Sequence, residues 1–130
     1  MKLLLDTHIV LAVVNEQTAK FPANIRALLA DHGSEFFVSV ASLWEIAIKS
    51  RLGKLALMFE LKLLPEMLTS GGLVILPIKA NHVLDAANPE PITRDPFDRL
   101  LLAQCLVEDL RLITVDRALA SHRMSASQVL

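Results

Sequence analysis

The chain has 130 residues, a formal net charge of −1 and a hydrophobic fraction of 53%. A chain of this length is expected to form a single domain, residues 1–130, around one core. Its near-neutral charge excludes a strong whole-molecule attraction to nucleic acid, so any such role must rest on local features. No run reaches the ~18 apolar residues that span a membrane. Asp6 and His8 interrupt the apolar start, and Cys105 has no disulfide partner, so we expect a cytoplasmic protein without a membrane segment.

Short apolar runs and longer helical stretches alternate along the chain. In chain order they predict a strand at Lys2–Leu5, a helix at Phe21–Asp31, a strand at Glu35–Val38, helices at Val40–Leu52 and Phe59–Leu68, a strand at Leu73–Leu76, a helix at Pro96–Leu110 and a strand at Leu112–Val115. The strands lack polar alternation, which is typical of strands buried on both faces of a parallel sheet. Asp95 and Pro96 mark the start of the last helix as its cap and first residue. The pattern predicts an α/β fold with helices on both faces of a mostly parallel sheet, and loops at residues 71–72 and 89–91.

Four acidic residues are expected to meet at one edge of this sheet. Asp6 and Asp116 each follow a predicted strand directly, and ligands of open parallel sheets bind outside the carboxyl ends of the strands. Asp98 lies in the first turn of the helix that leads into the last strand, and such a helix begins at the same edge. Glu45 is the only charged residue in the run VSVASLWEIAI, about one and a half turns into the helix after the second strand.

Each of these acids also has a structural interpretation. Asp6 and Asp116 are suited to cap a helix or close a turn. Asp98 complements the positive end of a helix dipole, and Glu45 is suited to pair with Lys49 on a solvent-facing side of its helix. The coincidence of four acids at one edge favours a functional site over four separate structural roles.

Clustered carboxylates repel one another, and a cation relieves that repulsion. Hard oxygen ligands with no His or Cys beside them at a transition-metal spacing favour Mg²⁺ or Mn²⁺, which activate water for phosphodiester hydrolysis. Neighbouring hydroxyl and basic side chains are candidates for holding these carboxylates or the substrate, although each hydroxyl is equally suited to cap a helix or turn. This group comprises Thr7, Ser39, Thr114, Arg94 and Arg99.

The segments LLLDTHIVL, SVASLWEIAIKSRLGKL, DPFDRLLLAQ and LITVD resemble, in order and spacing, the motifs of PIN-domain ribonucleases, specifically VapC-type toxins of toxin–antitoxin modules. The resemblance implies a PIN-like three-layer α/β/α sandwich with a mostly parallel central sheet. It implies a Mg²⁺ or Mn²⁺ site at Asp6, Glu45, Asp98 and Asp116, and hydrolysis of RNA. It further implies a homodimer that is inhibited by a small antitoxin, whose basic side chain would enter the acidic pocket.

The sequence departs from that family at Thr93, where relatives usually carry a His, and at Ala12, where a Trp is frequent. Neither change removes a carboxylate. Two other classes remain open. A phosphate-transfer enzyme of another α/β type would also have an acid after its first strand, but it needs a second Asp where His8 stands. A catalytically silent PIN-fold interaction module would not need to keep all four acids.

Overall fold

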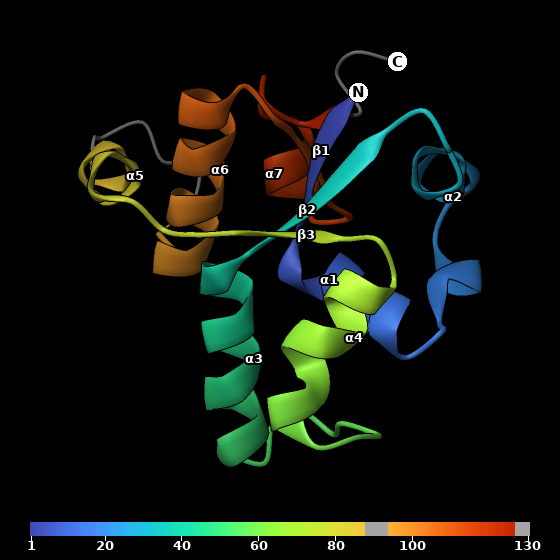
Figure 1. Cartoon of the computed structure of the whole chain (residues 1–130). Coiled ribbons are helices and arrows are strands. Elements are labelled where there is room, and N and C mark those ends of the chain that lie inside the picture. The colour runs from blue at the N-terminus through green and yellow to red at the C-terminus, as the bar shows by residue number, and fades with distance from the viewer. Residues whose placement is uncertain (88–93, 127–130) are drawn as a thin grey trace.

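A parallel sheet forms the centre of the molecule (Figure 1). The computed structural model describes residues 1–87 and 94–126, so the predicted loop at 89–91 and Thr93 lie outside the described residues. In this part of the chain the sheet has four strands in the order β3-β2-β1-β4, all parallel. They are β1 (Lys2–Leu5), β2 (Glu35–Ser39), β3 (Val74–Leu76) and β4 (Arg111–Ile113). The predicted α/β fold with a parallel sheet is confirmed.

The helices alternate with these strands. They are α1 (Thr7–Val14), α2 (Ala23–Leu29), α3 (Val40–Arg51), α4 (Leu64–Ser70), α5 (Ala80–Ala86), α6 (Pro96–Glu108) and α7 (Arg117–Ala120), with 3-10 turns η1 (Thr18–Lys20) and η2 (Leu61–Leu63). Three of them, α1, α5 and α7, were not predicted from the sequence. In α1 every residue after His8 is apolar and in α5 only His82 is buried, so neither shows a repeating apolar face, and α7 has only 4 residues.

Several predicted boundaries differ from the observed ones by one or more residues; the helix expected at Phe21–Asp31, for example, runs from Ala23 to Leu29. The helix expected from Phe59 begins as η2 and becomes α-helical only at Leu64, where Pro65 occupies the first turn. The last strand ends at Ile113 and not at Val115. Beyond it, the Thr114 hydroxyl accepts a hydrogen bond from the backbone N–H of Asp116 at 3.0 Å, which turns the chain away from the sheet.

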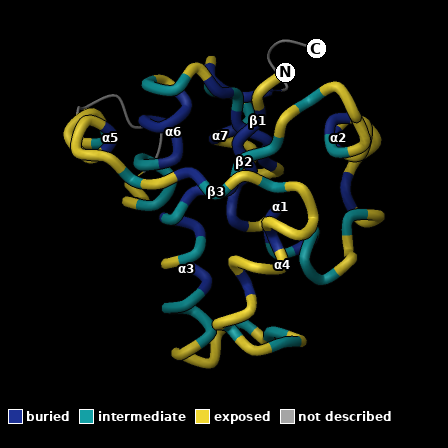
Figure 2. Tube along the Cα trace, viewed as in Figure 1, coloured by how far each residue is buried: buried dark blue, intermediate teal, exposed yellow. Residues whose placement is uncertain are grey.

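Side chains of β1 alternate between two helical layers. Leu3 and Leu5 pack with α1, α2 and α4, whereas Leu4 packs with α6 and α7, as the two-residue period of a strand requires. Figure 2 shows buried residues concentrated along the sheet and on the inner sides of the helices, while most of α5 and the loop after α3 are exposed. The molecule is therefore the expected three-layer α/β/α sandwich. No helix in the described ranges is long and apolar enough to cross a membrane.

A buried histidine ties α5 to α6. His82 is fully buried, and its Nδ1 accepts a hydrogen bond from the backbone N–H of Lys79 at 3.0 Å. That bond leaves the Nε2 proton to face Glu108 Oε1, 3.2 Å away. Gln104 adds a bond from its amide to the carbonyl of Pro77 at 3.2 Å. These bonds hold α5 against α6. Asp98 lies in the first turn of α6.

Candidate active site

The order of the strands reverses between β1 and β4. The chain adds β2 and then β3 on one side of β1, and returns to place β4 on the other side. Ligands of open parallel sheets bind at such a reversal. Here the backbone N–H of Asp6 donates to the carbonyl of Ile113 at 2.9 Å, and the Thr114 hydroxyl donates to Asp6 Oδ2 at 2.7 Å. The first predicted site residue therefore lies at the centre of this edge.

Asp6 caps a helix, as one interpretation expected, and its side chain is also buried. Its Oδ1 caps α1 by accepting the N–H of Thr7 at 2.6 Å, and its side chain is buried with Oδ2 held by Thr114. Burial raises the pKa of Asp6 above its ordinary value, and the Thr114 hydrogen bond only partly offsets this. A capping residue that is exposed to water would not carry this electrostatic cost.

Glu45 points inward from α3. Only 7% of it is exposed, so the solvent-facing interpretation was wrong. The Thr7 hydroxyl donates to Glu45 Oε1 at 2.7 Å and lies 3.0 Å from the hydroxyl of Ser42. Lys49 donates to Glu45 Oε2 at 2.6 Å, so the i,i+4 ion pair does form. Sequence reasoning missed Ser42, although its position one turn before Glu45 on the same helix face would have indicated it.

Asp98 is half-buried in the first turn of α6. Burial is the main cause that raises its pKa to about 7, and the negative charges of Asp95, Asp6, Glu45 and Asp116 raise it further. Electrostatic coupling of this kind requires the acids to be near one another in a medium that screens charge poorly. The four predicted acids thus share one electrostatic environment.

The exposed carboxylates at this edge also cap helices. Asp116 accepts the backbone N–H groups of Ala118 at 2.9 Å and Leu119 at 3.4 Å at the start of α7. Asp95 caps α6, as predicted, by accepting from Phe97 at 2.8 Å. Within residues 1–87 and 94–126, no three acidic, His or Cys side chains lie close enough together to form a ready-made metal centre.

The neighbouring polar residues divide into two groups. Thr7 and Thr114 hold Glu45 and Asp6, as one of their two interpretations expected. Ser39 instead caps α3 by accepting the N–H of Ala41 at 3.0 Å. Arg99 donates from Nε to the carbonyl of Ala86 at 3.1 Å, which links it to α5, and Arg94 is exposed.

A family comparison agrees with this geometry. The model of the PIN domain family matches residues 3–123. The chain belongs to the PIN domain family. Eight chains of solved structures also match it. One is from the crystal structure of VapBC2 from Rickettsia felis bound to a DNA fragment from their promoter, with a TM-score of 0.63, 15% sequence identity and 96% of each chain covered. No curated protein matches the chain significantly.

We predict that Asp98 destabilises this PIN domain as the pH rises. Its pKa is about 7 in the folded protein against an ordinary 3.8, so the unfolded chain releases this proton first, and the unfolding free energy falls between those two values. In EDTA, Asp98→Asn should raise the melting temperature by a few degrees at pH 8 and have little effect at pH 4. Thermal melts of wild type, Asp98→Asn and the exposed-acid control Asp85→Asn test this. A gain that is equal at both pH values, or equal in the control, would contradict it.

Proposed function

We propose that this PIN domain is a Mg²⁺- or Mn²⁺-dependent endoribonuclease that acts in the cytoplasm as the toxin of a toxin–antitoxin pair. The observation that carries the proposal is the approach of Asp6, Glu45 and Asp116 to half-buried Asp98 at one edge of the sheet, where burial and the charges of these acids and Asp95 raise the pKa of Asp98. Buried acids that repel one another weaken a fold, so their proximity favours a role that needs negative charge. Binding a hard divalent cation is such a role.

The chemistry of the donors fits Mg²⁺ or Mn²⁺. We propose that Asp6, Glu45, Asp98 and Asp116 hold the ion, since all four offer carboxylate oxygens. Binding would require side chains to rotate, because Lys49 and Thr7 occupy the oxygens of Glu45 and the amides of α7 occupy one oxygen of Asp116. When bound, such an ion lowers the pKa of a water molecule and stabilises the leaving oxygen of a phosphodiester.

The chain's own contribution is orientation. Thr114 holds one oxygen of Asp6 and the Thr7 N–H holds the other, so this carboxylate is fixed on both sides. The Thr7 hydroxyl does the same for Glu45. Hydrogen-bonded partners of this kind set the direction of a ligand before it binds. Burial of Asp6 and Glu45 keeps their environment low in water and therefore strengthens their interaction with a cation.

The toxin role rests on similarity. The motifs resemble those of VapC-type toxins. One of the solved structures that match, over 96% of each chain, is that of VapBC2. On this basis we propose that the chain forms a homodimer and is inhibited by a small antitoxin that inserts a basic side chain among the carboxylates. Such a basic side chain would be attracted strongly to Asp6 and Asp98, because the burial that raises their pKa values also reduces the screening of charge by water.

The nuclease proposal predicts RNA cleavage that stops in EDTA. Asp6→Asn and Asp98→Asn should each lower the rate roughly 100-fold or more while leaving the fold intact, because each removes a charged cation ligand. Asp95→Asn keeps a helix-capping side chain and should retain most activity, whereas Asp95→Ala should cost roughly 0.5–2 kcal/mol of stability. Gel assays on single-stranded RNA, with circular dichroism as the folding control, measure both effects. Undiminished cleavage by Asp98→Asn, or in excess EDTA, would contradict the mechanism.

The toxin proposal predicts growth arrest when the protein is expressed alone in a bacterial host. Asp98→Asn should not arrest growth, because the arrest depends on cleavage, and co-expression of the adjacent gene should restore growth to the wild type. Growth curves under an inducible promoter measure this. If the wild type is harmless at high expression and no neighbouring product binds it, the toxin role fails even where RNA cleavage is observed.

A further inference from the structure

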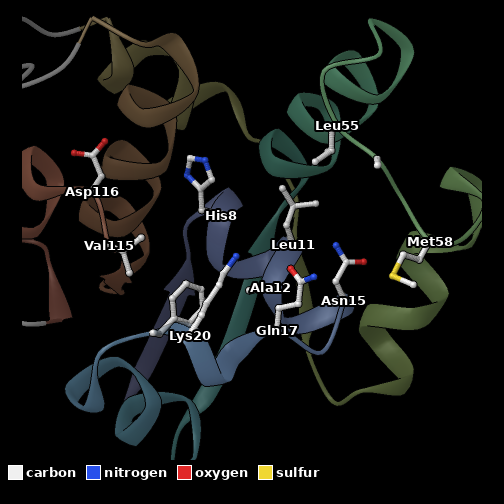
Figure 3. A pocket seen from close by; sticks show the side chains of 12 residues that line it. His8, Leu11, Ala12, Asn15, Gln17, Lys20, Leu55, Met58, Val115 and Asp116 are labelled. Atoms are coloured by element: carbon white, nitrogen blue, oxygen red, sulfur yellow. The ribbon is translucent and has the colours of Figure 1, made fainter.

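A pocket of about 650 Å³ opens beside the candidate active site (Figure 3). This volume is within the range of roughly 300–1,000 Å³ that is usual for pockets that bind small molecules. One stripe of α1 forms its floor, with His8, Leu11, Ala12 and Asn15 at the i, i+3, i+4 and i+7 spacing of a single helix face. The remaining walls are Gln17, Lys20, Phe21, Leu55, Ala56, Met58, Val115 and Asp116.

The pocket runs from the acidic edge to a pair of amides. Asp116 and His8 line the end beside the carboxylates, while Asn15 and Gln17 lie at the far end of α1 with Leu11 in between (Figure 3). Seven residues of helix separate His8 from Asn15, which corresponds to about 10 Å. A nucleotide spans about this distance. With its phosphate at the acidic edge, its base would therefore reach the amides of Asn15 and Gln17.

Asn15 supplies an unmet hydrogen bond. Its amide oxygen is buried and has no hydrogen-bond partner among the described residues. Buried polar atoms are nearly always satisfied, and a rotation of the Asn15 side chain, which lines the pocket, would turn this oxygen toward a ligand that provides a donor. Every RNA base carries an N–H group on its edge. Between the two ends, Leu11, Ala12 and Leu55 present the apolar surface that the flat faces of a base require.

We infer that this pocket holds one unstacked base of the RNA substrate, on the nucleotide next to the phosphodiester that is cleaved. The inference rests on the proposed nuclease function and adds to it a source of sequence preference. Enzymes that act on nucleic acids commonly move a base out of its stack into such a pocket and recognise its edge by hydrogen bonds. Asn15 and Gln17 are the residues that contact the base edge, and Lys20 is a cation on the same wall for the RNA backbone.

A hydrophobic peptide suits this pocket less well. Five of its twelve lining residues are polar: His8, Asn15, Gln17, Lys20 and Asp116. An apolar segment would cover the Asn15 oxygen without offering it a donor, and would remove Lys20 and Asp116 from water without compensation. A base with its sugar and phosphate offers apolar faces to the middle of the pocket, donors to Asn15 and a negative charge to Lys20.

The test uses the four nucleoside 5′-monophosphates as probes, with ribose 5-phosphate as the probe that lacks a base. Binding is followed by NMR in buffer that contains Mg²⁺, because the carboxylates alone would repel the phosphate, through the side-chain amide signals of Asn15 and Gln17. We expect at least one nucleotide to shift these signals, while ribose 5-phosphate does not. Asn15→Leu should lower the affinity for that nucleotide about two- to tenfold, because a hydrogen bond is lost. The matched control Asn24→Leu, an exposed position on α2 outside the pocket, should leave the affinity unchanged.

Cleavage provides the second measurement. Asn15→Leu should broaden the distribution of cleavage sites on a random-sequence RNA, while Asn24→Leu should keep the wild-type distribution. If RNA is cleaved but no nucleotide binds, or ribose 5-phosphate binds equally well, the inference fails and the nuclease proposal stands. If nucleotides bind at Asn15 but RNA is not cleaved under any divalent cation, the nuclease proposal fails and base recognition remains. If Asn15→Leu changes neither measurement but abolishes binding of the protein encoded by the adjacent gene, the pocket is a protein-docking site and the inference is overturned.

Discussion

The hydrogen bond from Thr114 to Asp6 joins the ends of β1 and β4 at the point where the order of the strands reverses. Its position follows from the topology, because β4 can lie beside β1 only after the chain has crossed the sheet. That crossing places α6 on the face opposite α1, with its first turn at the carboxyl edge. Asp98, in the first turn of α6, therefore comes near Asp6. The gathering of acids at this edge is a consequence of how a parallel sheet is connected.

The same edge carries an electrostatic conflict. Burial and mutual repulsion raise the pKa of Asp98 to about 7 and also raise the pKa of Asp6. Hydrogen bonds from the Thr114 hydroxyl and the Thr7 backbone lower the pKa of Asp6 and offset its burial only in part. Sites that are built for function often keep such unfavourable interactions, which the rest of the fold must offset. The two buried apolar layers on either side of the sheet provide that stability.

The sequence was sufficient for the features that depend on local pattern and was insufficient for those that depend on contacts. Buried strands and the capped start of α6 were recognisable because apolar runs and the Asp95-Pro96 pair are local signals. Short α7 has no such signal, and its start became visible only through the cap by Asp116. Ser42 also contacts the Thr7 hydroxyl across two helices, so its spacing from Glu45 indicates which face of α3 it occupies but does not reveal this partner.

The central claim is that these carboxylates form a site for a divalent cation, and anomalous diffraction from crystals soaked in Mn²⁺ tests it most directly. The account predicts an anomalous peak between Asp6 and Asp98, with the Glu45 side chain turned away from Lys49 toward the ion. It also predicts that the peak disappears in crystals of Asp98→Asn. Crystals that show no peak among these acids at saturating Mn²⁺, while Lys49 stays bound to Glu45, would contradict it.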